Sequence, residues 1–123
     1  MATVKAELER WFTNDYRVSN PDFIEIVRAW RRQVDAQSYG GSACVLATGV
    51  RELTRPITPV SLPTMVITKE NDSGSTPDMA KIIASEIDQA DFCIVPKLKY
   101  LELIEQPQSF TQPVIEFFRK LPL

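Results

Sequence analysis

Histidine is absent from this 123-residue sequence. The chain therefore lacks the commonest general base of enzymes and the commonest metal ligand, so we expect neither a metal nor a cofactor. No apolar run approaches the ~20 residues that span a bilayer, and a net charge of −2 gives no reason to expect nucleic acid as a partner. Met1–Arg10 is charged and has no apolar secretory segment, so we expect a cytoplasmic protein without a membrane partner.

Cysteine is also scarce, because Cys44 and Cys93 are the only two in the sequence. Both lie in apolar surroundings, which predicts buried free thiols rather than a disulfide. The composition is otherwise that of a globular protein, with 44% hydrophobic residues. We expect a single compact domain made of a helical segment (residues 1–50), a connector (51–62) and an α/β segment (63–123).

Three helices are predicted in the first segment. The first is capped by Thr3 and ends around residues 13–15, the second begins at Pro21, and the third covers Ala36–Ala47 with Gly49 as its stop. Apolar residues at helical spacing are predicted to face the core. They are Val4, Leu8, Trp11 and Phe12 in the first helix, Phe23, Val27, Trp30 and Val34 in the second, and Tyr39, Ala43, Leu46 and Ala47 in the third.

The α/β segment is predicted to hold one right-handed βαβ unit. Thr64–Thr68 and Phe92–Val95 are apolar runs without alternation, which is typical of parallel strands covered on both faces. Between them, Thr76 and Pro77 mark a helix start. The connector before the unit has room for one helical turn at Val50–Leu53. After the unit we expect a loop over residues 97–105 and a last helix that begins near residue 111 or kinks at residue 113.

The sequence of this segment resembles the C-terminal part of an α/β-hydrolase. Residues 63–67 with Asp72 and Gly74-Ser75-Thr76-Pro77 are similar to the family's penultimate strand and the acid-bearing turn after it. Residues 87–92 resemble the approach to its last strand, and residues 101–107 resemble the loop before its final helix. Residues 9–13 and 39–40 are similar to the lid of the β-ketoadipate (3-oxoadipate) enol-lactonase branch.

The resemblance implies an α/β protein with a partial α/β-hydrolase fold. It would consist of a helical lid region of three helices, one βαβ unit with two parallel strands, and a C-terminal helix. Asp72 would match the acid of the family's catalytic triad, and Tyr100 stands where the family places its histidine. A tyrosine, with a reference pKa of about 10, cannot take a serine proton near neutral pH. We therefore predict no catalytic residue.

The nucleophile motif of the family, G-x-S-x-G, has only a superficial counterpart. Gly40-Gly41-Ser42-Ala43-Cys44 lacks the spacing of the motif and lies in a predicted helix. Asp72 is more simply interpreted as a turn residue that accepts hydrogen bonds from backbone amides. Glu102 and Glu105 could form an acid–base pair, but we favour a structural role for Glu105 as a charge at the start of the last helix.

Several aromatic residues are candidates for binding an apolar ligand. They also suit the core of the lid region, which is the simpler interpretation, although a core and a pocket can share walls. Tyr100 either lines such a pocket or fills the space of the lost imidazole. The candidates are Trp11, Phe12, Trp30, Tyr39 and Tyr100. The arginines Arg28, Arg31 and Arg32 are expected on a solvated face.

A two-stranded sheet is marginal alone, so the edge of Thr64–Thr68 should attract another strand. We therefore predict a non-catalytic binding or interaction module that forms a homodimer through this edge. Two alternatives stay open at this point. The chain could be one half of a split esterase or lactonase that needs an N-terminal half-hydrolase chain, or it could be a truncated hydrolase without a selected function.

Overall fold

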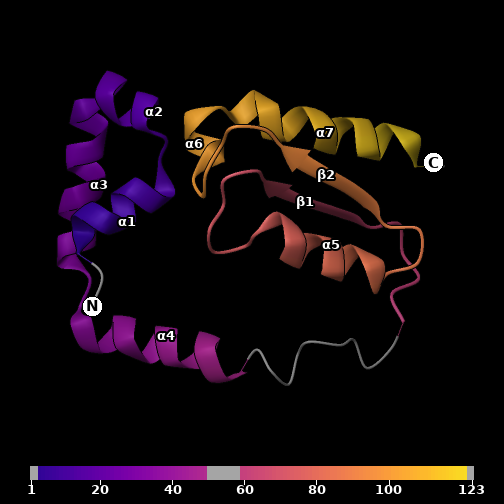
Figure 1. Cartoon of the computed structure of the whole chain (residues 1–123), viewed down its shortest axis with the longest axis horizontal. Helices are drawn as coiled ribbons and strands as arrows, with labels where there is room; N and C mark the ends of the chain where they lie inside the picture. Colours follow the sequence, from indigo (N-terminus) through magenta and orange to yellow (C-terminus); the bar gives the residue numbers. More distant parts are fainter. Residues whose placement is uncertain (1–2, 50–58, 122–123) are drawn as a thin grey trace.

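The computed structural model describes residues 3–49 and 59–121, and the predicted helical turn at Val50–Leu53 lies outside them. One end of the molecule holds α1 (Val4–Trp11), α2 (Asn14–Ser19) and α3 (Pro21–Gln33) (Figure 1). The other end holds β1 (Met65–Lys69), α5 (Pro77–Ser85), β2 (Asp91–Val95) and α7 (Pro107–Lys120). Helix α4 (Ala36–Gly49) lies between these groups in the chain, and the short helix α6 (Glu102–Glu105) lies between β2 and α7.

The helix starts follow the local signals of the sequence. The hydroxyl oxygen of Thr3 accepts the amide of Ala6 at 3.3 Å, and that of Thr76 accepts the amide of Met79 at the same distance. Prolines occupy the first position of α3 and α5, where a missing N–H costs no hydrogen bond. These three predicted starts are confirmed.

The first helix ends earlier than predicted. It stops at Trp11, where Phe12 becomes extended, and Thr13 then caps the separate short helix α2 by accepting the amide of Tyr16 at 3.3 Å. A threonine hydroxyl that binds a following amide favours a new N-terminus over continuation of the same helix. The first segment therefore has four helices instead of three.

The core of the helical end is formed by Leu8 and Phe12 from α1 and its C-terminal flank, with Ile24 and Val27 from α3. The Phe12 ring is fully buried. The expected stripe on α3 was wrong at two positions, because Trp30 and Val34 are exposed. The row of α3 side chains that includes Ile24 faces the core instead. This row has the same helical period as the predicted row, so the period alone does not distinguish the two.

Helix α4 forms as predicted, but its predicted inward face was wrong. Every residue from Gly40 to Thr48 is exposed, and Tyr39 alone of the four expected inward residues is half-buried. The Cys44 thiol is therefore exposed instead of buried, whereas Cys93 on β2 is half-buried. Burial raises the pKa of the Cys93 thiol, with a smaller contribution from the carboxylate of Glu116.

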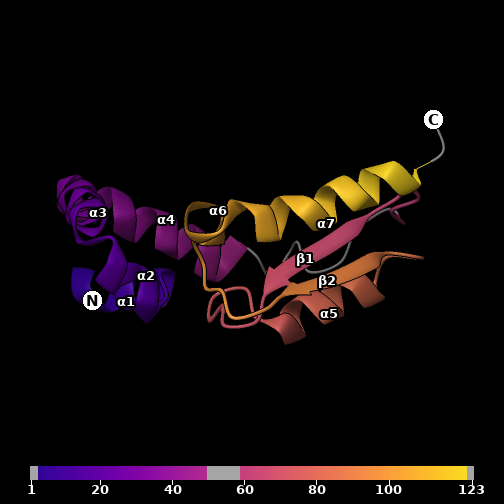
Figure 2. The ribbon, with the colours of Figure 1, turned by 90° about the horizontal axis from the view of Figure 1, so that it is seen from above.

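The two strands pair in parallel, as predicted, with Met65 opposite Asp91 and Lys69 opposite Val95. The sheet lies between α5 and α7, which cover opposite faces (Figure 2). This cover is partial, so the expectation of strands buried on both faces was wrong. Phe92 and Ile94 are more than one-third exposed, and Ile82 of α5 is 63% exposed.

The C-terminal part connects the sheet to the helical end. The predicted loop over residues 97–105 contains helix α6, and the last helix begins at Pro107 with Pro113 inside it. The amide of Leu101 donates to the carbonyl of Trp11 at 3.0 Å. Glu105 accepts the amide of Thr13 at 2.8 Å, so it joins the two ends instead of serving the start of the last helix. Among the described residues, no helix has the length and apolar character needed to cross a membrane.

Candidate ligand-binding cleft

A cleft of about 290 Å³ opens where the helical end, α4 and the loops of the sheet end meet. It brings together three of the five aromatic candidates and Asp72, the residue that the family resemblance matches to the triad acid. Its walls are formed by Arg10, Trp11, Tyr39, Leu46, Asp72, Gly74 and Tyr100. Larger hollows lie elsewhere, including one of about 440 Å³ beside α2, but neither the aromatic candidates nor Asp72 line that hollow. The cleft is therefore the candidate site.

Asp72 is fixed in the turn that follows β1. Its Oδ1 accepts the amide of Gly74 at 2.8 Å and that of Ser75 at 2.9 Å, and the side chain is almost fully buried. The hydroxyl of Thr68 donates to the carbonyl of Ser75 at 2.6 Å and closes the same turn. Asp72 thus accepts hydrogen bonds from backbone amides, which is the turn role that we predicted from the sequence.

Lys69, the last residue of β1, lies between two buried carboxylates. Its ammonium is 2.9 Å from Asp72 Oδ2 and 3.4 Å from Glu102 Oε2. The contact with Asp72 is an ion pair without the alignment of a hydrogen bond, since Oδ2 has no hydrogen-bond partner in the described chain. The same ammonium lies 5.4 Å from the centre of the Tyr100 ring.

These contacts set the charge states of the pair. Burial favours the neutral form of Asp72, but the amide of Ser75, the ammonium of Lys69 and the amide of Gly74 outweigh it and lower the pKa of the carboxyl. Burial likewise opposes the charge of Lys69, yet the carboxylates of Asp72 and Glu102 raise its pKa. Both groups are therefore ionised at neutral pH.

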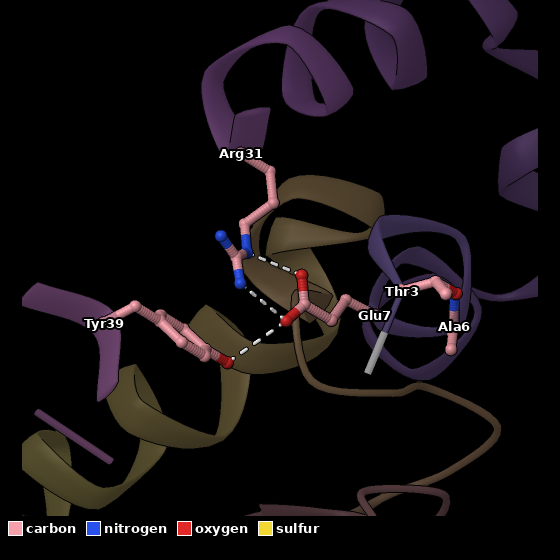
Figure 3. Close-up of polar contacts among 5 residues, drawn as sticks. All are labelled: Thr3, Ala6, Glu7, Arg31 and Tyr39. Carbon is pink, nitrogen blue, oxygen red and sulfur yellow. Dashed lines mark hydrogen bonds and ion pairs between the residues drawn. The ribbon is translucent and has the colours of Figure 1, made fainter. Parts of the chain in front are cut away.

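A second polar cluster, absent from the sequence predictions, includes Tyr39, which also lines the cleft (Figure 3). Arg31 donates from Nε and from one terminal nitrogen to the two carboxylate oxygens of Glu7, at 2.6 and 2.9 Å. The hydroxyl of Tyr39 donates to Glu7 Oε1 at 3.1 Å. The guanidinium also lies over the Tyr39 ring, 4.1 Å from its centre. We call Glu7, Arg31 and Tyr39 the clasp.

The prediction that Arg31 belongs to a solvated face was wrong, since its side chain is 13% exposed. The hydrogen bonds from Arg31 lower the pKa of Glu7 against its burial, and Tyr39 adds to this effect. A signal for the burial of Arg31 exists in the sequence. Arg31 follows Ile24 by seven residues and Val27 by four, so it continues the buried row of α3.

The remaining candidates lie outside the cleft. Phe12 belongs to the core of the helical end, and Trp30 is 59% exposed on α3. Ser42 lies on the exposed α4, and its hydroxyl donates to the carbonyl of Ser38 at 3.1 Å. Glu102 pairs with Lys69 and Glu105 with Thr13, so the two glutamates serve separate structural contacts.

Three solved structures resemble the chain over most of its length. The enol-lactonase from Burkholderia xenovorans LB400 matches with a TM-score of 0.79 and 24% identity over 95% of this chain. A thermophilic esterase from Thermogutta terrifontis matches with a TM-score of 0.69 and 27% identity over 95% of this chain. An N-acyl homoserine lactone-degrading enzyme matches with a TM-score of 0.67 and 18% identity over 93%.

The chain has a partial α/β-hydrolase fold. It spans only 44%, 43% and 47% of those three chains, consistent with the C-terminal portion that the sequence resembles. No protein-family model matches the sequence, and no curated protein matches it either. The predicted likeness to an enol-lactonase is therefore confirmed at the level of the fold. The correspondence of Asp72 and Tyr100 with triad positions stays a prediction.

Proposed function

We propose that the chain is a non-catalytic α/β-hydrolase-like module that binds a small, flat, largely apolar molecule in the cleft. The observation that carries this proposal is the state of Asp72. Its carboxylate is engaged by two backbone amides and the Lys69 ammonium. The aromatic ring beside it is that of Tyr100, and the sequence contains no histidine to serve as a base.

The walls of the cleft support binding. Trp11, Tyr39 and Tyr100 present aromatic surface, and Leu46 adds an aliphatic side chain. Binding pockets are usually apolar with a few polar groups and occupy ~300 Å³ or more, so a cleft of about 290 Å³ suits a compound of one or two rings. Asp72 and Arg10 are the charged residues among its walls.

Binding can be measured through Trp11, because Trp30→Phe leaves it as the only tryptophan of the sequence. Coumarin, a flat aromatic lactone, is a suitable probe. We expect it to change Trp11 fluorescence with saturation, and Tyr100→Ala to weaken binding. Phe118→Ala, on the exposed side of α7, is the control and should bind as before. If Tyr100→Ala bound coumarin as tightly as the parent, the binding site would lie outside the cleft.

The non-catalytic part of the proposal has its own test. The purified protein should not hydrolyse p-nitrophenyl esters or an enol-lactone, and Tyr100→His should not create activity, because no nucleophile elbow is present in the sequence. Turnover that survives repurification and disappears in Asp72→Asn would overturn this part.

The partner we propose is a second copy, paired through the edge of β1 that faces away from β2 and that no other strand covers within residues 3–49 and 59–121. The carbonyl of Thr64 accepts the amide of Asp91, and the amide of Glu70 donates to Val95. The backbone groups of alternate residues of β1 therefore hydrogen-bond to β2. Those of Met65, Ile67 and Lys69 point to the opposite edge of the strand. A two-fold contact there would give an antiparallel pair and a continuous four-stranded sheet.

Light scattering on a size-exclusion column, over a dilution series, tests the dimer. We expect a dimer that dissociates on dilution, and we expect Ile67→Pro, which removes one outward amide, to shift it toward monomer. A monomer at every concentration would contradict the proposal.

A second candidate is half of a split hydrolase, and the surface of α4 favours it. Its 14 residues include no charged side chain, yet the nine from Gly40 to Thr48 are all exposed. The matched structures are also roughly twice as long as this chain. Co-expression with the unmatched part of the Burkholderia xenovorans enol-lactonase tests this candidate. A one-to-one complex that displaces the homodimer would support it, and separate elution would contradict it.

A further inference from the structure

We propose that Glu7 and Arg31 are positioning residues of the cleft. They hold the Tyr39 ring in the cleft wall and thereby fix the place of α4. The inference rests on the proposed binding function only in its consequence for ligands, since the position of α4 can be measured without one.

The geometry of the clasp supports this role. Glu7 lies on α1, Arg31 on α3 and Tyr39 on α4, so three helices meet at one carboxylate (Figure 3). The guanidinium binds both oxygens of Glu7, and the Tyr39 hydroxyl shares Oε1. The same guanidinium stacks on the ring, 4.1 Å from its centre. The ring is thus held by its hydroxyl and by one face.

Burial makes these contacts hard to exchange for water. The Glu7 side chain is 2% exposed and that of Arg31 is 13% exposed. A buried carboxylate is stable only while its oxygens have donors, so movement of Tyr39 would remove one donor from Glu7. The clasp therefore favours one position of the tyrosine ring.

Helix α4 has few other attachments in the described structure. Its first turn is closed by the amide of Ser38, which donates to Asp35 Oδ2 at 2.7 Å, and the residues after Tyr39 are exposed up to Thr48. Leu46, which also lines the cleft, lies seven residues after Tyr39 and so on the same face of the helix. Fixing Tyr39 therefore places both α4 residues of the cleft.

Distances between spin labels test the inference directly. In a Cys93→Ser background, one label is attached to the exposed Cys44 on α4 and the other to Lys81→Cys, an exposed position on α5. We expect a narrow distance distribution for the parent protein. Glu7→Gln should broaden or shift it, and Tyr39→Phe, which keeps the ring over Arg31, should have a smaller effect.

The chain offers a matched control on the same helix as Arg31. Arg28 donates to Glu25 at 2.9 Å, and the Glu25 side chain is 66% exposed. Glu25→Gln should leave the Cys44 distances unchanged. A second label pair, Ala29→Cys with Lys81→Cys in a background without native cysteines, reports whether α3 itself moves, and we expect no change there in any variant.

The ligand measurement separates this inference from the proposed function. Glu7→Gln should weaken coumarin binding by roughly fivefold, the scale of one lost hydrogen bond. Unchanged Cys44 distances in Glu7→Gln would overturn the inference, as would an equal change in the Ala29 pair, which would mean general loss of packing. Altered Cys44 distances in a protein that binds no coumarin would support the clasp and contradict the binding function.

Discussion

The two ends of the molecule differ in how they bury apolar side chains. At the helical end, Leu8 and Phe12 are almost completely enclosed, and Ile24 and Val27 complete a continuous core. At the sheet end, Ile82 of α5 and Phe118 of α7 are each 63% exposed, although both helices have amphipathic sequences. The helical end therefore encloses a continuous core, although Trp30 and Val34 stay exposed, whereas the two helices of the sheet end leave much of their apolar surface uncovered.

The sheet end is instead ordered by its backbone pairing and its buried charges. Lys69, Asp72 and Glu102 form a nearly buried group at the end of β1. Such groups fix the geometry of turns, but they give little net stabilisation compared with apolar burial. Contiguous exposed apolar surface is typical of interaction surfaces, so we propose the sheet end as the place for a partner.

The largest expected effect is on the core of the helical end. Phe12→Ala removes a fully buried ring that stacks on Tyr16 and meets the edge of Phe23. It should lower the free energy of unfolding by about 3–5 kcal/mol, measured by urea denaturation. Phe118→Ala is the matched change at the sheet end and should cost less than about 0.5 kcal/mol. Equal losses of unfolding free energy in the two variants would mean that Phe118 is covered in solution. The two ends would then not differ in burial.

An intermediate effect is expected for the buried charges. Asp72→Ala removes the acceptor for two backbone amides and one partner of Lys69. The thermal midpoint should fall by an amount that corresponds to about 1–3 kcal/mol, because buried donors lose their acceptor. Asp78→Ala is the control, since Asp78 pairs with Lys81 on the surface of α5. An Asp72 effect no larger than that of Asp78 would contradict the structural role of the turn.

Alkaline pH should distinguish the two ends, because their buried carboxylates have different cations. The raised pKa of Lys69 means that its stabilisation is complete below the unfolded value of about 10.4 and is lost as the pH rises through the folded pKa. Arg31 stays charged throughout this range. The difference in stability between the parent and Lys69→Met, measured in urea, should therefore be constant up to the unfolded value of about 10.4 and shrink at higher pH. A constant difference between them up to the alkaline limit would contradict the pairing.

Acid should affect both ends in the same direction. The pKa values of Glu7 and Asp72 are lowered, so their contributions are present above the unfolded values of about 4 and are lost as the pH falls through the folded values. The difference in stability between the parent and Glu7→Gln should therefore shrink below about pH 4. If the stability difference persisted in acid, the charge of Glu7 would not be its cause.

Local features of this fold could be predicted from the sequence. Thr3, Pro21 and Thr76 act within one helical turn, so each helix start depends on neighbouring residues only. The parallel strand pair was also predicted correctly, because strand and helix patterns follow from short segments, and the hydrolase-like fold was predicted from the family resemblance.

Contacts between distant residues could not be predicted in this way. Glu7 and Tyr39 are 32 positions apart, and Thr13 and Glu105 are 92 positions apart. Periodicity also left the orientation of α3 undecided, because the rows through Trp30 and through Arg31 have the same spacing. Of the candidate site, the sequence indicated the aromatic walls and Asp72, but it gave no reason to connect Arg31 with Tyr39.

The smallest effect is expected where the sheet end has an exposed ion pair. Lys120 of α7 lies 3.6 Å from Asp91 at the start of β2, and the two side chains are 70% and 49% exposed. Water screens such a pair, so Lys120→Ala should change the free energy of unfolding by less than about 0.5 kcal/mol, and salt should reduce even this. Urea denaturation at low and high salt measures both. A larger loss that salt does not diminish would mean that this edge is buried against another chain in solution. The uncovered sheet end would then be a property of the isolated chain, and the apolar side chains of α5 and α7 would mark where its partner sits.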